Sequence, residues 1–104
     1  MPKNSARKIV KSFVLKMKRD GFPFERVYLF GSCAKGLDKK WSDIDVCVVS
    51  DKFAGKRWDS YEKRLWRLRR EIDSRIEPIG MTNEEFNGLS PLSEEVKKTG
   101  IRVV

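Results

Sequence analysis

Two aspartates separated by one residue carry the clearest chemical signal in this chain of 104 residues. Asp43 and Asp45 lie in the run Asp-Ile-Asp-Val-Cys-Val-Val, whose alternating pattern predicts a β-strand over residues 43–49. On a strand both carboxylates lie on one face, roughly 7 Å apart at their backbones. Two charged carboxylates at that separation repel each other unless a cation lies between them. Mg²⁺ is the simplest such cation, because it commonly takes one or two carboxylates together with phosphate oxygens.

A glycine-bounded segment, Gly31-Ser32-Cys33-Ala34-Lys35-Gly36, follows a short apolar strand predicted at residues 26–30. Gly31 permits a ligand to approach the backbone closely. If a helix begins at Ser32, that residue offers a hydroxyl and a backbone N–H to a phosphate. A Gly-Ser pair after a strand is usually only a turn, and an Asp-x-Asp pair is often an exposed strand edge. The two motifs in this order and spacing are far more specific than either alone.

The composition narrows the possible chemistry. The chain has no histidine, which excludes Ser-His-Asp and Cys-His catalysis and zinc sites with histidine ligands. Its 23 Lys and Arg residues against 15 Asp and Glu give a net charge of +8. That excess suggests an anionic partner, although it also keeps a small domain soluble.

The two cysteines, Cys33 and Cys47, are too few for a disulfide scaffold and match no zinc spacing. No stretch is long and apolar enough for a signal peptide or a membrane span. We therefore expect a reduced, cytoplasmic protein.

The remaining pattern predicts the elements that hold these motifs in place. Apolar periodicity indicates helices over residues 5–20 and 58–72, and residues 50–56 are expected to form a loop. A third strand is predicted over 75–79, with Pro78 indicating an edge position or the strand's end. Thr82 to Glu85 fits a capping box, Ser90-Pro91 opens a helix that ends at Gly100, and 101–104 adds a last strand. We expect one α/β (α+β) domain over residues 1–104, with a small mixed β-sheet flanked by helices.

Residues 31–50, GSCAKGLDKKWSDIDVCVVS, resemble the signature of the nucleotidyltransferase superfamily related to DNA polymerase beta. More narrowly, the chain resembles the minimal nucleotidyltransferases, which are single-domain proteins of about this length. The resemblance implies a nucleotidyltransferase-like fold. It implies that Gly31 and Ser32 bind the β- and γ-phosphates of a nucleoside triphosphate. It also implies that Asp43 and Asp45 hold two Mg²⁺ ions with the help of a third carboxylate.

Two acidic residues near the third strand are candidates for that third carboxylate. Asp73 lies at the predicted end of the preceding helix, where it could equally form a turn. Glu77 lies in the run Arg-Ile-Glu-Pro-Ile, where an isolated acid is costly to bury without a cation. Many minimal family members carry Ile-Glu-Pro here, so we assign the role to Glu77. The alternative is an exposed glutamate on an edge strand.

The chain departs from the family pattern at Cys33, where many relatives carry arginine. Lys35 keeps a positive charge two residues further on and could substitute for that arginine, as a point charge without the bidentate fork. Ser42 is assigned to the nucleotide site, where it caps or orients the start of the strand carrying Asp43 and Asp45; the alternative is a purely structural role.

The resemblance implies a metal-assisted, in-line attack by an acceptor hydroxyl on the α-phosphorus of a nucleoside triphosphate, with AMP as the expected group transferred. Minimal family members often act with a small helical protein as toxin–antitoxin pairs. In such pairs the nucleotidyltransferase transfers AMP to a tyrosine of the partner. We therefore expect a separate helical partner, with an antitoxin role for this chain, or a homodimer.

Two other interpretations stay open. One is a catalytically idle binding or antitoxin subunit on the same fold. The other is a basic nucleic-acid-binding module that uses residues 63–70 with Trp58, Tyr61 and Trp66. Of these aromatics, Trp58 and Tyr61 fall on the apolar stripe of the predicted helix and should pack in the core, and only Trp66 falls outside it.

Overall fold

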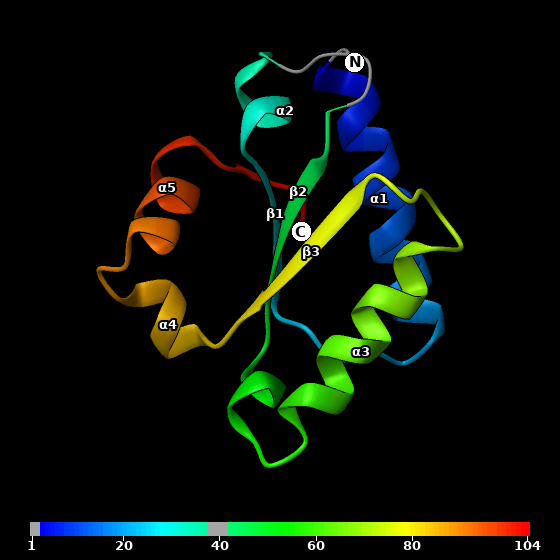
Figure 1. Cartoon of the computed structure of the whole chain (residues 1–104), viewed down its shortest axis with the longest axis vertical. Helices are drawn as coiled ribbons and strands as arrows, with labels where there is room; N and C mark the ends of the chain where they lie inside the picture. The colour runs from blue at the N-terminus through cyan, green and yellow to red at the C-terminus, as the bar shows by residue number, and fades with distance from the viewer. Residues whose placement is uncertain (1–2, 38–41) are drawn as a thin grey trace.

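A computed structural model describes residues 3–37 and 42–104 as a four-stranded sheet with helices on both faces (Figure 1). The strands are β1 (Arg26–Phe30), β2 (Ile44–Val49), β3 (Ile76–Met81) and β4 (Ile101–Arg102). The helices are α1 (Lys3–Arg19), α2 (Ser32–Lys35), the 3₁₀ helix η1 (Asp51–Ala54), α3 (Trp58–Arg69), α4 (Asn83–Asn87) and α5 (Pro91–Thr99). The predicted order of helices and strands is confirmed.

The sheet is mixed, as the sequence predicts. Its strand order is β3-β2-β1-β4, in which β1 pairs antiparallel with both β2 and β4, whereas β2 and β3 are parallel. The parallel pair needs a crossover, and η1 and α3 supply it. Pro78 lies on the edge strand β3, where its missing N–H costs no ladder hydrogen bond on the open side.

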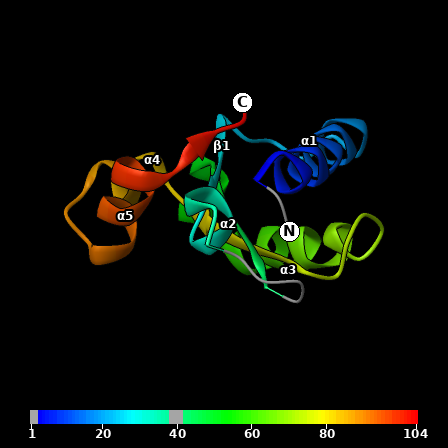
Figure 2. The ribbon, with the colours of Figure 1, turned by 90° about the horizontal axis from the view of Figure 1, so that it is seen from above.

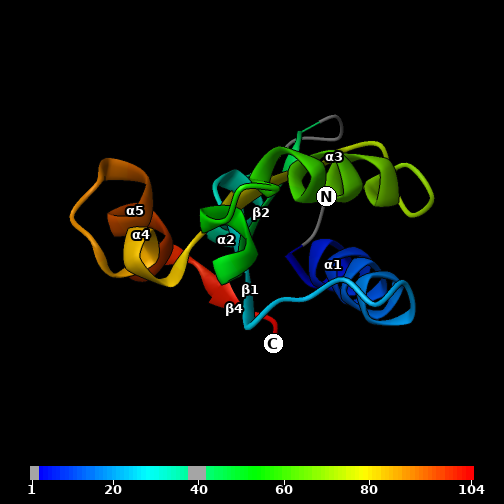
Figure 3. The ribbon, with the colours of Figure 1, turned by 90° about the horizontal axis from the view of Figure 1, so that it is seen from below.

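Helices α1 and α3 cover one face of the sheet, and α4 and α5 lie on the other. Figure 2 and Figure 3 show this division from the two ends of the molecule. The alternation along β2 divides the core accordingly. Ile44, Val46 and Val48 join the cluster that contains the apolar sides of α1 and α3, whereas Cys47 and Val49 join Phe86 and Val96 from α4 and α5. The face of β2 that carries Cys47 also carries Asp45, so this carboxylate lies on the α4/α5 side.

The short helices are fixed by local polar contacts that the sequence indicates. The Thr82 side chain accepts from the Glu85 N–H at 3.0 Å, and the Thr82 N–H donates to the Glu85 carboxylate at 2.9 Å. This reciprocal capping box starts α4, and the Ser90 hydroxyl accepts from the Ser93 N–H at the start of α5. The two caps fix where α4 and α5 begin.

Four sequence predictions need correction. Trp58, expected in the core, is 51% exposed. It is the first residue of α3, which begins at the lower end of the molecule in Figure 1, and the buried side of this helix consists of Leu65 and Leu68 further along. Residues 50–56 contain a turn of 3₁₀ helix instead of an irregular loop, with Phe53 packed over Gly80 of β3. The last strand is two residues long, because only 101–102 pair with β1.

The helix at 58–72 ends earlier than expected, at Arg69, and Arg70 to Ile72 continue as turns.

None of the helices in the described part of the chain has the length and apolarity that a membrane span needs.

Candidate active site

The strand directions bring the two predicted motifs to one end of the sheet. β1 ends at Phe30 and leads directly into Gly31 and α2, while its antiparallel neighbour β2 begins at that same end. β3 is parallel to β2, so it also begins there. Figure 1 shows this end at the top of the molecule, with α2 above the sheet and α5 beside it. The Gly-Ser segment, the two aspartates and Glu77 therefore meet at one end of the sheet.

Asp45 lies between two strand neighbours that matter for the site. On β3 its registered partner is Glu77, and on β1 it is Phe30, the residue before Gly31. Because registered residues on adjacent strands project from the same face, the side chains of Asp45 and Glu77 are neighbours. Both are half-buried, while Asp43, just before β2, is exposed. Glu77, the residue predicted to be the third carboxylate, is thus in register with Asp45.

Gly31 lies against the Asp45 carboxylate. Its φ is +74°, a conformation that favours glycine, and a Cβ at this position would overlap the Asp45 side chain. Position 31 therefore favours glycine for two reasons. The backbone has a positive φ, and the Asp45 side chain leaves no room for a Cβ. The sequence suggests close backbone approach at Gly31, and the structure shows that the group approached is this carboxylate.

Helix α2 is a single turn bounded by Gly31 and Gly36. Ser32 is its first residue and is half-buried, so a helix does begin where the sequence suggests. Cys33 is buried, and its thiol donates to the Asp43 carbonyl oxygen at 3.4 Å. Cys33, which stands where many relatives have arginine, thus connects α2 to the start of β2. Ser42, also half-buried, lies one residue before Asp43.

Asp45 is a site carboxyl with a clearly raised pKa. Partial burial raises the pKa of the Asp45 carboxyl from 3.8 to about 6, and the nearby negative charges of Glu77, Asp43 and Glu95 add to the increase. A carboxyl in this environment gains from a neighbouring cation more than a solvent-exposed one does. Perturbed carboxyls of this kind are typical of functional sites.

Glu95 on α5 is a site residue that sequence reasoning missed. Its carboxylate accepts from the Lys35 ammonium at 3.3 Å, so Lys35 is joined to α5 across the site. In the sequence Glu95 is one of several charged residues on an amphipathic helix, 60 positions from Lys35. Only the fold brings it beside the Gly-Ser segment.

Asp73, the other candidate for the third carboxylate, has a structural role. Its side chain accepts from the Arg75 backbone N–H at 2.9 Å and from the Arg75 guanidinium at 2.7 and 3.0 Å. The hydrogen bond from the Arg75 side chain is the main reason that the pKa of Asp73 is lowered. Asp73 stabilises the turn that enters β3.

The donor set at this end of the sheet fits Mg²⁺ chemically. It consists of carboxylate oxygens, which magnesium prefers, and the cradle between Gly31 and Asp45 leaves the Asp45 side chain unobstructed by a side chain at position 31. Within residues 3–37 and 42–104, no three acidic or thiol side chains lie close enough together to hold a metal ion, so Asp43, Asp45 and Glu77 do not form an assembled ligand set in this structure. Magnesium bound here would take few of these carboxylates and complete its shell with phosphate and water.

A groove lies between the end of β3 and the α4/α5 layer. It has a volume of about 430 Å³ and is lined by Ile79, Gly80, Met81, Glu85, Gly88, Leu89, Ser90 and Leu92. Gly31, Asp45 and Glu77 are not among its lining residues.

Two aromatic residues of α3 already have partners within the chain. Tyr61 packs edge-on against Phe22 with ring centres 5.9 Å apart. The guanidinium of Arg69 covers the ring of Trp66 at 4.6 Å. Tyr61, predicted in the core, is partly buried and packs against the core cluster, whereas Trp58 and Trp66 are exposed.

Comparison with known proteins identifies the family. Residues 7–101 match the model of the nucleotidyltransferase domain. The protein adenylyltransferase MntA of Shewanella oneidensis is 34% identical over 65 residues, covering 58% of this chain and 45% of MntA. The chain therefore matches less than half the length of that curated relative.

Solved structures show the same fold. A crystal structure from Sulfolobus solfataricus, assigned as a nucleotidyltransferase, aligns with a TM-score of 0.62 at 22% identity, over 96% of this chain and 80% of that one. A toxin–antitoxin structure with AMP-PNP aligns with a TM-score of 0.60 at 25% identity, over 89% of this chain and 71% of that one. A variant of the toxin–antitoxin MntA-HpeT, with two aspartates two positions apart changed to glutamate, aligns with a TM-score of 0.58 at 20% identity, over 100% of this chain and 73% of that one. Together with the arrangement of Gly31, Asp45 and Glu77, the family match places this chain in the nucleotidyltransferase domain family.

Proposed function

We propose that the protein transfers a nucleoside monophosphate, with AMP as the first candidate, from a nucleoside triphosphate to an acceptor hydroxyl in a Mg²⁺-dependent reaction. The observation that carries the proposal is the position of Asp45, which is in register with Glu77, two residues after Asp43 and against the bare backbone of Gly31. This arrangement leaves carboxylate oxygens available at one end of the sheet, beside the first turn of a helix. Histidine is not needed.

In this proposal Asp43, Asp45 and Glu77 would hold two Mg²⁺ ions. When bound, these ions supply charge neutralisation for the triphosphate and lower the pKa of the acceptor hydroxyl. The role of the three carboxylates is to fix the position of that charge, and the half-burial of Asp45 and Glu77 strengthens their interaction with it.

The same proposal assigns the phosphates to α2. The first-turn N–H groups of a helix have no carbonyl partner within the helix, so the N–H of Ser32 can donate to a phosphate oxygen, as can the Ser32 hydroxyl. Gly31 allows the phosphates to approach the backbone. Lys35 adds a positive charge at the end of this turn, and Ser42 orients the chain that leads into Asp43.

We further propose that the acceptor is a protein, namely a tyrosine of a small helical partner, and that this chain acts as the antitoxin in the cytoplasm. The name of the curated relative, protein adenylyltransferase, supports a protein acceptor. Two of the structural neighbours are toxin–antitoxin assemblies, one of them with the nucleotide analogue AMP-PNP. In the proposed transfer, the acceptor oxygen forms a bond to the α-phosphorus, the bond from the α-phosphorus to pyrophosphate breaks, and the hydroxyl proton is released.

The test uses ATP labelled either at the α- or at the γ-phosphate. Purified protein with Mg²⁺ is incubated with each small helical protein found to be encoded next to its gene, and labelled protein is detected after electrophoresis and mass spectrometry. We expect incorporation from α-labelled ATP alone, with a mass gain on the partner equal to AMP. Incorporation from the γ-label would indicate phosphorylation and contradict the proposal.

A matched pair of variants separates catalysis from binding. The double variant Asp43→Asn, Asp45→Asn should lose incorporation, whereas Asp73→Asn should keep it, because Asp73 pairs with Arg75. If the double variant still neutralises the partner without labelling it, the chain acts as an idle binding subunit.

A further inference from the structure

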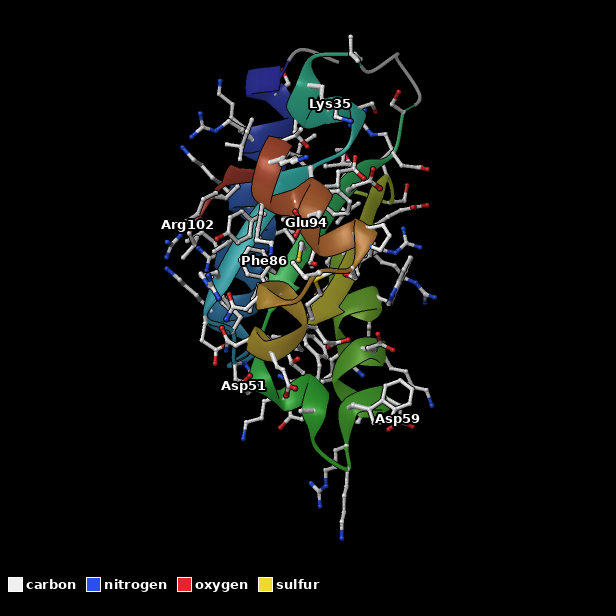
Figure 4. The ribbon with its side chains drawn as sticks, turned by 90° about the vertical axis from the view of Figure 1, so that its left-hand side faces the viewer. Lys35, Asp51, Asp59, Phe86, Glu94 and Arg102 are labelled. Atoms are coloured by element: carbon white, nitrogen blue, oxygen red, sulfur yellow. The ribbon has the colours of Figure 1, made fainter. Side chains whose placement is uncertain are left out.

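Lys35 and Glu95 join the two segments that border the site. Lys35 ends α2, directly after the Gly-Ser segment, and Glu95 lies on α5, with 3.3 Å between the ammonium nitrogen and the carboxylate oxygen. Figure 4 views the molecule from this side, with Lys35 above α5. Their side chains are 40% and 41% exposed, so the pair can separate without opening the core.

Glu95 neutralises Lys35, the cation at the end of the Gly-Ser segment. Lys35 lies on the turn that follows Gly31, and Gly31 lies against the Asp45 carboxylate. The ion pair therefore places the negative charge of Glu95 at the border of the site.

The neighbouring residue Glu94 has a different partner. It pairs with Lys97 on its own helix at 3.6 Å, and its side chain has the same exposed fraction, 41%. Glu94 is thus a matched control for position 95 on the same helix.

We propose that Glu95 is a specificity-determining residue that makes the site select metal-complexed over free triphosphate. The inference rests on the proposed function. Free triphosphate carries several negative charges and meets Asp43, Asp45, Glu77 and Glu95, with Lys35 already neutralised. Mg²⁺ removes most of that repulsion, because it is attracted to the same carboxylates. Once the triphosphate is bound as the metal complex, Lys35 can turn from Glu95 to a phosphate oxygen.

The test measures the affinity for AMP-PNP by calorimetry at low salt, in Mg²⁺ and in EDTA, for the wild type, Glu95→Gln and Glu94→Gln. We expect Glu95→Gln to tighten binding in EDTA by about fivefold, the upper range for an exposed ion pair. In Mg²⁺ its effect should be under about twofold, since the metal already screens the site. Glu94→Gln should match the wild type in both buffers.

A second measurement asks whether Glu95 acts through Lys35. In the Lys35→Met background, the effect of Glu95→Gln in EDTA should fall by at least half, the rest coming from the aspartates. Far-UV circular dichroism and melting temperature confirm that each variant is folded.

Three results overturn the inference: equal effects of Glu95→Gln and Glu94→Gln, weaker binding by Glu95→Gln, or no measurable binding by Glu95→Gln in EDTA. In each of these cases, wild-type binding in Mg²⁺ leaves the proposed function standing. If the wild type binds AMP-PNP in neither buffer, the proposed function fails and the inference fails with it.

Discussion

Gly31 is in contact with the carboxylate of Asp45, and the contact joins the end of β1 to the start of β2. A side chain at position 31 would overlap that carboxylate and would also have to adopt a φ of +74°. The glycine thus couples the phosphate-binding segment to the metal-binding aspartates in the proposed site. This coupling is a physical reason for glycine at that position beyond the geometry of a turn.

Gly31→Ala is expected to lower both stability and nucleotide affinity. The added methyl group displaces Asp45, and the backbone conformation alone costs about 1–3 kcal/mol for a residue other than glycine. Binding of AMP-PNP in Mg²⁺ should weaken by at least about tenfold, or ~1.4 kcal/mol. Urea unfolding and calorimetry measure the two effects.

Gly21→Ala is the control for backbone strain. Gly21 has a φ of +70°, but a methyl group added there would meet nothing within 4 Å, and the residue follows α1, away from the site. Its substitution should lower stability and leave nucleotide affinity unchanged. Equal losses of affinity in the two variants would contradict the role given to the Gly31–Asp45 contact.

Asp45→Asn is expected to stabilise the metal-free protein at neutral pH. The pKa of Asp45 is raised to about 6 in the folded state, so its favourable contribution is complete below 3.8 and is lost as pH rises through 6. After allowance for solvent screening, the cost of the charged form at pH 7 is on the order of 1 kcal/mol, or ~4 °C in melting temperature. Melting curves in EDTA at pH 4 and pH 7 should show a gain that appears only at the higher pH.

Asp73→Asn should show the opposite sign. Because hydrogen bonding to Arg75 lowers the pKa of Asp73, its contribution is present above 3.8 and is lost as pH falls through the lowered value. The Asn variant is therefore less stable than the wild type at pH 7, and the difference shrinks in acid. Stabilisation by both variants at pH 7 would contradict the electrostatic account.

Glu77→Gln is expected to reduce the rate of transfer more than nucleotide affinity. We assign Asp43 and Asp45 to both proposed Mg²⁺ ions, and Glu77 only to the ion that would serve the acceptor hydroxyl. The rate should fall by about 100-fold, or ~2.7 kcal/mol in the barrier, with AMP-PNP affinity changed by less than about threefold. Single-turnover labelling and calorimetry measure the two quantities. A loss confined to affinity would reverse the assignment.

Much of the fold follows from local sequence patterns. The alternation in β2 predicts both its faces, and Thr82 with Glu85 marks the start of α4, because these signals depend on neighbouring residues only. The prediction for Trp58 is wrong because periodicity shows which side of a helix is apolar but not where the sheet beneath it ends. The edge position of β3 is indicated by Pro78 alone.

Some residues of the candidate site could be predicted from the sequence, and one could not. Gly31, Ser32, Asp43 and Asp45 are identified by their order and spacing, and Glu77 by the family resemblance. Glu95 could not be found from the sequence, since nothing near it distinguishes it from Glu94. Its position beside Lys35 depends on how α5 packs against the sheet, which is a tertiary property.

The most direct test of the central claim is a calorimetric titration of AMP-PNP into the wild type and into the Asp43→Asn, Asp45→Asn variant, each in Mg²⁺ and in EDTA. The account predicts saturable binding by the wild type in Mg²⁺ and at least about 100-fold weaker binding by the variant. Substituting residues that only contact a metal ligand weakens metal binding by ~10- to 100-fold, and the loss of two ligands themselves should cost at least the upper value. In EDTA the variant should bind no worse than the wild type, because the aspartates then only repel the phosphates. Equal affinity of the two proteins in Mg²⁺, or no binding by the wild type, would contradict it.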